Sequence, residues 1–374
     1  MNSQGLPSTS RFERLLGFWE SDRGNVRLLA DAAAAALDEG RGEEALVLLE
    51  RGEAEGQAPP ELLNLKGLAA LASRRADAAR DAFAALAAAG LGGPAVRFNL
   101  AAAEAGLGDH EAVLALLDEE TVAAVDGGPL LRIRALHHLG RVDQALEEGA
   151  VHAEARPGDG ALMGALAQIA LDAEQPELAR AYAERAGSDP EGLAAAGTLR
   201  LDEGRADEAL DLFRRAAAAA PHSARAALGL GSALLAGGDA AAAVEPLERA
   251  AEGFGDHPGS WIAAGWARYL RGDRAEARER FERALACDDN FAESHGALAV
   301  VDIAEGHVDE GRKRLEIATR LDRQCFSAAL ARTLLLEREG HQAAADKVRA
   351  AALAAPVDAA GRTLAEALAA LGRH

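Results

Sequence analysis

The sequence predicts an all-α protein, a solenoid in which antiparallel helix pairs stack one after another. Two observations predict this fold: short turns that recur about every 34 residues along most of the chain, and small residues that recur at fixed distances from those turns. Each repeat has room for one pair of helices. One pair cannot bury its apolar face alone, so neighbouring pairs must stack.

The turns read Gly-x-x-acid-acid-Ala or a close variant, and a glycine there supplies the left-handed cap that ends the first helix of each pair. Successive turns are 34 residues apart, except for a 32-residue step before the fourth turn and a 30-residue step before the sixth. We expect the 30-residue step to remove about one helical turn from a connection or a second helix, and to change the curvature of the array there. The ten turn residues are Gly40, Arg74, Gly108, Gly140, Glu174, Gly204, Gly238, Gly272, Gly306 and Gly340.

Small residues recur seven residues before the turn and five residues after it, which predicts close approach of the two helices. A larger apolar residue follows four positions later on the same face of the second helix, where it fills the space beside that contact. The small residues after the turn are Ala45, Ala79, Ala145, Ala179, Ala209, Ala243, Ala277, Gly311 and Ala345, with Val113 as the exception. The larger residues are Leu49, Phe83, Leu117, Phe213, Leu247, Phe281 and Leu315.

The repeat resembles the tetratricopeptide repeat family over about residues 26–356. The family motif is W-x2-L-G-x2-Y followed by A-x3-F, A and P, and three consecutive units match it best. The matching residues of the sixth unit are Ala196, Gly197, Gly204, Ala209, Phe213, Ala216 and Pro221. Those of the seventh are Leu230, Gly231, Gly238, Ala243, Leu247 and Ala250, and those of the eighth are Trp261, Ala264, Gly265, Gly272, Ala277, Phe281 and Ala284. The resemblance implies a right-handed superhelix of ten such repeats. The family's tyrosine late in the first helix is missing, for instance at Arg200 and Arg268.

The two ends of the array predict capping segments, because a solenoid leaves an apolar face at each end. We expect a cap at 1–25, ten repeats at 26–357 and a capping helix at 358–374. Near the N-terminus, four apolar residues at helical spacing predict a helix: Phe12, Leu15, Leu16 and Trp19. We expect that the polar residues before this helix do not cap it. The alternative is that this helix is an anchor that docks on a partner or in the array's own groove. The C-terminal helix carries Leu364, Ala367, Leu368 and Leu371.

Composition excludes several classes of protein. The 374 residues carry 60 acids and 40 bases, a net charge of -20, and no basic stripe, which argues against nucleic acid as a partner. Cys287 and Cys325 match neither a redox pair nor a zinc site and are expected to be free thiols. No apolar run is long enough for a membrane span, and the first residues do not resemble an export signal. We expect a cytoplasmic protein.

Motifs of catalysis and cofactor binding are missing, so we expect no enzyme, no cofactor and no metal. There is no phosphate loop, no H-E-x-x-H and no G-x-S-x-G. Adjacent His137 and His138 point about 100° apart on a helix, and no third ligand is spaced to join them. Gly229 and Gly231 fall inside a predicted helix and are interpreted as close-packing residues. Acid pairs such as Glu43-Glu44 and Glu119-Glu120 are interpreted as exposed helix starts and faces.

The resemblance implies that positions 2, 5, 6, 9, 12 and 13 of each first helix line a concave groove. Its known clamp for a chaperone tail needs Lys at position 5 and Asn at position 9, and no repeat has either, so that ligand is not expected. Two clusters of candidate partner-binding residues remain: Phe98, Asn99, Arg134, His137 and Gln168; and Ile262, Trp266 and Tyr269. The alternative for Trp266 and Tyr269 is packing against the next repeat's first helix. Trp261 is assigned to the core.

These observations predict a non-enzymatic scaffold or adaptor that binds a partner peptide or protein segment in the groove. The acidic charge predicts that basic or arginine-rich partners associate faster, and less tightly at high salt. The alternative is a regulatory module that senses a small ligand or peptide and relays the signal to another protein. The sequence leaves the oligomeric state open.

Overall fold

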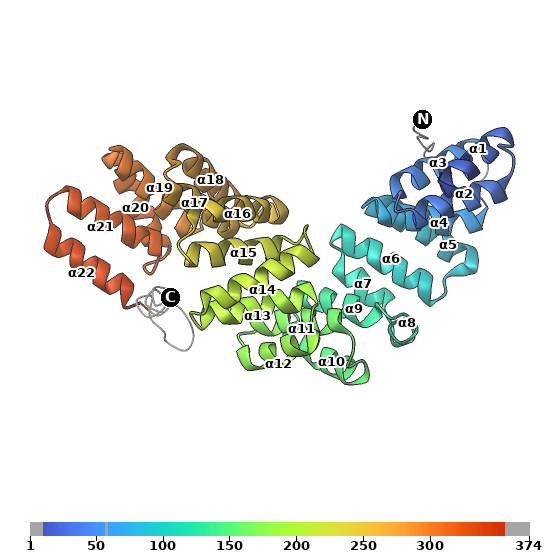
Figure 1. Cartoon of the computed structure of the whole chain (residues 1–374), viewed down its shortest axis with the longest axis horizontal. Helices are drawn as coiled ribbons and strands as arrows, with labels where there is room; N and C mark the ends of the chain where they lie inside the picture. Colours follow the sequence, from blue (N-terminus) through green and yellow to red (C-terminus); the bar gives the residue numbers. More distant parts are fainter. Residues whose placement is uncertain (1–9, 57–58, 356–374) are drawn as a thin grey trace, which may run out of the picture. The chain divides into compact units, whose positions relative to one another are not determined.

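The computed structural model describes residues 10–56 and 59–355, which form helices joined by short connections and contain no β-strand. The chain divides into two compact units, of which the first ends at Arg156 and the second begins at Pro157. Figure 1 labels the helices in chain order.

The first unit holds one leading helix and four repeats. The leading helix is α1 (Arg11–Ser21), and the first two repeats are regular helix pairs. The repeats of this unit are α2 (Val26–Asp38) with α3 (Gly42–Ala54), α4 (Pro60–Ala72) with α5 (Ala76–Leu86), α6 (Pro94–Leu107) with α7 (His110–Leu116) and α8 (Glu119–Ala124), and α9 (Gly128–His138) with α10 (Val142–Ala155). A short π-helix, Ala87–Leu91, follows α5.

The second unit holds six repeats, each a pair of antiparallel helices. The pairs are α11 (Gly160–Asp172) with α12 (Pro176–Ala186), α13 (Pro190–Asp202) with α14 (Ala206–Ala219), α15 (Ala224–Ala236) with α16 (Ala240–Phe254), α17 (Pro258–Arg271) with α18 (Arg274–Cys287), α19 (Ala292–Glu305) with α20 (Val308–Leu321), and α21 (Phe326–Arg338) with α22 (Gln342–Leu353). Ten pairs are therefore present, as the turn spacing predicts.

All ten predicted turn residues have a positive φ, which confirms the turn ladder residue by residue. Eight of them are glycines, for which this conformation is free of steric cost. Arg74, with φ 57°, and Glu174, with φ 56°, are the two described residues other than glycine with a positive φ. The geometry of the repeat thus imposes the left-handed conformation even where the sequence does not supply glycine.

The contact between the helices of a pair is also confirmed. Every alanine predicted five residues after a turn is buried with no exposed surface, and so is Val113. The glycine seven residues before the turn faces the larger apolar residue of the second helix. A methyl group at Gly197 would come within 2.9 Å of Phe213 Cε2, and one at Gly67 within 2.5 Å of Phe83 Cζ. Small residues on one helix therefore make room for the ring on the other.

The irregular steps in the sequence correspond to shortened second helices. In the fifth repeat α12 has 11 residues where α14 has 14, and the connection that follows is one residue shorter. In the third repeat α7 has only seven residues. The N-cap residue of its successor α8 is Asp118, whose Oδ1 accepts a hydrogen bond from Thr121 N at 2.8 Å. Glu119 and Glu120 are the acidic first turn of α8, as Glu43 and Glu44 are of α3.

Helix α1 packs on the first repeat. Phe12 and Trp19 are 3% and 0% exposed and share a core with α2 and α3. The expectation that no residue caps this helix was wrong. Ser10 Oγ accepts a hydrogen bond from Glu13 N at 3.1 Å, and Ser10 N donates one to Glu13 Oε2 at 3.0 Å. This is a capping box, which the spacing of Ser10 and Glu13 already contained.

Within each unit, every first helix after the first one packs on the second helix of the preceding repeat, and it also contacts the first helix of that repeat. In the first unit α2 packs on α4, α4 on α6 and α6 on α9, and in the second unit α11, α13, α15, α17, α19 and α21 pack each on the next. Among the described residues, no two successive second helices make an extensive contact of this kind. Each unit therefore has one continuous layer of first helices, here called the first-helix layer.

Candidate functional site

The first predicted cluster is divided between the two units. Phe98 and Asn99 lie on α6 and Arg134 and His137 on α9, two helices that pack together in the first unit. All four side chains are half-buried. A methyl group at Gly127 would come within 2.9 Å of Phe98 Cζ, so this ring closely approaches the start of α9. Part of the Phe98 ring is therefore packed inside the protein.

Gln168 belongs to the second unit, on α11, and is 9% exposed. Its Nε2 donates a hydrogen bond to Asp172 Oδ1 at 3.2 Å, within the same helix. Arg225 Nη1 lies 3.9 Å from the same carboxylate oxygen. The amide of Gln168 is therefore held in a polar chain that links the fifth and seventh repeats.

The second cluster is assembled on α17. The ring of Trp266 meets Tyr269 edge-on at 5.5 Å between centroids and Phe281 at 5.3 Å. Ile262 is 8% exposed and packs in the core that holds Phe281. Trp266 and Tyr269 also pack against residues of α19, the first helix of the next repeat, as the alternative interpretation expects. Both nevertheless remain only half-buried.

A neighbouring leucine extends this cluster. Leu270, directly after Tyr269, is 63% exposed. It occupies position 13 of the same first helix, a position that the family's groove rule includes. Sequence register could therefore have selected it, but only the structure shows that its side chain lies in solvent. Trp266, Tyr269 and Leu270 are here called the α17 patch.

Trp261 lies on the same helix and has a structural role. Its side chain is half-buried between two core clusters. The indole Nε1 donates a hydrogen bond to the carbonyl oxygen of Gly255 at 2.7 Å, and Arg283 lies over the ring at 5.7 Å. This agrees with its assignment to the core.

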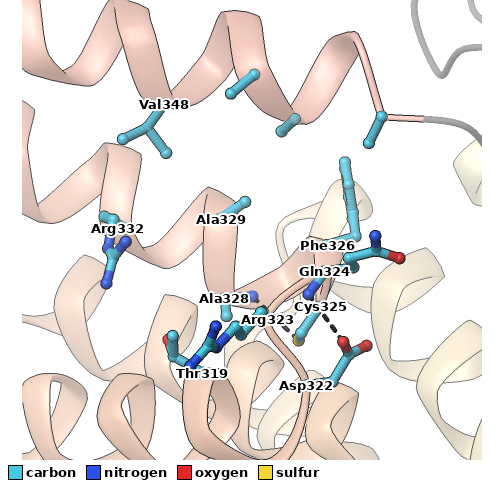
Figure 2. A pocket seen from close by; sticks show the side chains of 13 residues that line it. Thr319, Asp322, Arg323, Gln324, Cys325, Phe326, Ala328, Ala329, Arg332 and Val348 are labelled. Atoms are coloured by element: carbon cyan, nitrogen blue, oxygen red, sulfur yellow. Dashed lines mark hydrogen bonds between the residues drawn. The ribbon is translucent and has the colours of Figure 1, made fainter.

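A cavity of about 590 Å³ lies between α20, α21 and α22, near the end of the second unit (Figure 2). Arg323, Arg332 and the 48% exposed Phe326 line it, together with alanines of α22. Burial raises the pKa of the Cys325 thiol to about 12, so this cysteine is a poor nucleophile. The predicted capping helix at 358–374 lies outside the described residues.

Four well-formed cavities, near α1 and α3, α8 and α10, α12 to α14, and α20 to α22, are lined by residues other than the predicted partner-binding ones. Across residues 10–56 and 59–355, no three His, Cys, Asp or Glu side chains are grouped so that they could hold a metal ion. The candidate site is therefore the surface of α17 that carries these aromatic and leucine side chains.

A family model described as "Tetratricopeptide repeat" matches residues 200–261, from the end of α13 into α17. The same turn, small residue and helix pair recur ten times along the chain. The chain is a tetratricopeptide repeat protein. No curated protein sequence matches it.

Among solved structures, this tetratricopeptide repeat protein is similar to YrrB, whose title describes "a TPR protein with an unusual peptide-binding site". The two are 19% identical, with a TM-score of 0.41, over 49% of this chain and 97% of YrrB. It is also similar to MamA from Desulfovibrio magneticus RS-1, at 19% identity and a TM-score of 0.39, over 44% of this chain and 96% of that one. These likenesses concern the fold of the repeats.

The repeats depart from the family at the position of the missing tyrosine, four residues before each turn. Arg268 Nε donates a hydrogen bond to Glu248 Oε1 at 2.8 Å, and Arg280 Nε donates one to Glu248 Oε2 at 2.7 Å. In this tetratricopeptide repeat protein an ionic bridge thus joins the seventh and eighth repeats at this position. No described helix is both long and apolar enough to cross a membrane.

Proposed function

We propose that this tetratricopeptide repeat protein is a non-enzymatic scaffold or adaptor that binds a segment of a partner protein on its first-helix layer. The observation that carries the proposal is the α17 patch, in which two half-buried aromatic rings and an exposed leucine lie on one first helix. Aromatic side chains that are already ordered by their neighbours lose little entropy on binding and are common anchors at interfaces.

Packing within the second unit supports this location. First helices pack on one another and second helices do not, and the more closely packed layer of a curved stack lies on its inner side. The family's groove rule selects the same layer. The proposal therefore extends to Phe98, Asn99, Arg134, His137 and Gln168 as further contacts, and to Ile262 as support beneath Trp266.

Charge supports a basic partner. The protein carries a net charge of -20. Position 13 of the fifth and sixth repeats is acidic, with exposed Asp172 and Asp202. Because such surface charges are screened by salt, binding of a basic segment weakens as ionic strength rises. Binding that does not change with salt contradicts this part of the proposal.

The test is affinity capture from the native lysate, followed by measurement of Kd with the captured partner's minimal fragment. Leu270→Asp is the sharpest variant, because a residue that is 63% exposed is not needed for folding. Trp266→Ala and Arg134→Ala are run beside it after their helicity has been checked. Ile317→Asp on α20, a second helix, is the matched control with a 40% exposed apolar residue.

We expect Leu270→Asp and Trp266→Ala to weaken binding by about 2 kcal/mol each and Ile317→Asp to leave it unchanged. Equal affinity of all variants contradicts the proposal. Capture of no protein, together with a small molecule that copurifies, favours the ligand-sensing alternative instead.

A further inference from the structure

The second helix of the third repeat is broken into two short helices, and the first unit has a groove beside the second of them. In regular repeats of this chain the second helix runs for about four turns, whereas α7 ends after seven residues. Leu117 still fills its expected core position with no exposed surface, but its backbone is no longer helical. The chain then turns into α8 and never occupies the volume that the last turns of a full-length second helix would fill.

Beside α8 lies a groove of about 930 Å³, within the size range of ligand sites. All of its lining residues belong to the first unit, with one wall from α8 and the two residues before it, the other from α10 and Arg156, and Arg132 of α9 between them. Its apolar lining consists of Leu117, Val122, Ala123, Val151 and Ala155. Val151 is 67% exposed, so an apolar side chain stands open at the edge of the groove. We call this volume the broken-repeat groove.

Most charges in the groove are already paired. Arg132 donates hydrogen bonds to Glu148 Oε2 at 2.7 Å, to Glu148 Oε1 at 3.2 Å and to the Leu117 carbonyl oxygen at 3.1 Å. The hydrogen bond from Arg132 lowers the pKa of Glu148, so this carboxylate stays ionised. Asp118 caps α8 and lies 3.6 Å from Arg97. These groups hold the groove together and are not available to a ligand.

The end of the groove formed by α10 is left positive. Arg156 forms no ion pair within the described residues. It lies close enough to His152 to lower the pKa of that imidazole, after the larger effect of burial, and Arg132 acts in the same direction while Glu148 opposes it. A carboxylate placed between His152 and Arg156 would meet one permanent cation and one group that can become a second. Glu119 lines the opposite wall, on α8.

We propose that the broken-repeat groove is a second binding site, separate from the first-helix layer, for a partner peptide segment that carries apolar side chains next to carboxylates. The apolar side chains contact Val122 and Val151, and a carboxylate pairs with Arg156. The preference is opposite to the basic segment favoured by the acidic first-helix layer, so the two surfaces select partners of different charge.

The test uses two labelled synthetic peptides of equal length, one a repeat of Leu-Leu-Glu and one a repeat of Leu-Leu-Lys, with anisotropy as the readout on the full chain. We expect the Glu peptide to bind more tightly than the Lys peptide. Arg156→Glu and Val151→Asp should each weaken binding of the Glu peptide about tenfold, in line with loss of one charge pair or one apolar anchor. Val47→Asp, at a 46% exposed valine on α3, is the matched control and should change nothing.

Three results overturn the proposal. One is a Glu peptide that binds all variants equally or no better than the Lys peptide. Another is a wild-type dimer, seen by light scattering, that Val151→Asp dissociates, since a second copy then occupies the groove. The third is displacement of the peptide by decanoate together with loss of the peptide's charge preference, which indicates a small-molecule site. Leu270→Asp should leave Glu-peptide binding intact, so this test fails or succeeds independently of the α17 patch.

Discussion

Arg268 and Asp302 occupy the same position in consecutive repeats, four residues before the turn, and carry opposite charges. Arg268 pairs with Glu248 of the preceding repeat, whereas Asp302 accepts a hydrogen bond from Arg278 Nη2 at 2.7 Å and lies 3.0 Å from Arg314 Nε. The Asp302 side chain is 5% exposed. Two arginines from different second helices thus share one buried carboxylate, and Arg278 Nη2 also donates a hydrogen bond to Glu305 Oε2 at 2.8 Å.

Asp302→Ala should therefore be destabilising. It removes the buried acceptor that Arg278 and Arg314 share, but both guanidinium groups stay partly exposed and Arg278 keeps Glu305, so the loss should be about 1–3 kcal/mol. Urea unfolding measures the change. Glu316→Ala, which removes one side of the exposed pair with Arg320, is the control and should cost less than about 0.5 kcal/mol. Similar losses in the two variants would show that the buried bridge adds nothing.

The two turn residues that are not glycine predict stabilising substitutions. Arg74 and Glu174 hold a left-handed conformation that costs about 1–2 kcal/mol for residues with a Cβ. Arg74→Gly and Glu174→Gly should each raise the free energy of unfolding by roughly 1 kcal/mol, because the relief exceeds the extra entropy of glycine in the unfolded chain. Gly140→Ala, at φ 71°, should do the reverse. Unchanged denaturant midpoints for all three would contradict this.

The two helices of a pair pack so closely that adding one methyl group between them should lower the stability of the fold. A Cβ on Gly265 would overlap the ring of Phe281, which is fully buried. Gly265→Ala should destabilise by about 1–3 kcal/mol even though alanine is the better helix former. Adding Phe281→Leu should recover part of that loss, which is the signature of direct contact. Gly17→Ala on α1, where nothing lies within 4 Å, should instead stabilise by up to about 1 kcal/mol.

Stacked histidines predict a loss of stability in acid. The rings of His110 and His138 lie 4.3 Å apart and nearly parallel. His138 is exposed on one side, but partial desolvation against its neighbours, and then the charges of His110, His137 and Arg134, lower its pKa. A histidine whose folded pKa is lowered stabilises the fold above its unfolded value of about 6.5, and that contribution is lost as the pH falls below it.

Stability measured by urea unfolding should thus decrease between about pH 7 and pH 5, and His138→Gln should make the decrease shallower. His341→Gln, at an exposed turn residue, is the control and should leave the slope as it is. A slope that His138→Gln leaves unchanged would show that the stacked pair is not its source.

Removal of α1 separates the two interpretations of this helix. Trp19 has no exposed surface, and Arg51 lies over its ring at 5.3 Å. If α1 is a cap, deletion of residues 1–21 should lower Tm markedly, and Trp19→Ala alone should cost about 3–5 kcal/mol. If α1 is a docking anchor, deletion should leave Tm nearly constant and abolish partner binding. Calorimetry together with the capture assay measures both.

The repeat could be predicted closely from sequence because each position of the helix pair meets the same neighbours in every copy. Leu117 shows how far this extends, since it is buried as predicted although its helix has already ended. The capping box of Ser10 was readable but missed. The extent of burial of Trp266 and Tyr269, the exposure of Leu270 and the groove beside α8 could not be predicted. They depend on where neighbouring repeats and interrupted helices leave space, which no single repeat encodes.

The contacts between helices favour folding that proceeds along the chain from one repeat to the next. Within the described residues, each extensive contact joins helices that are close neighbours in the chain. Such a protein has a low contact order, and little loop-closure entropy must be lost before stabilising contacts form. During synthesis α1, α2 and α3 can pack as soon as they leave the ribosome, and each later pair can add to a surface that is already folded.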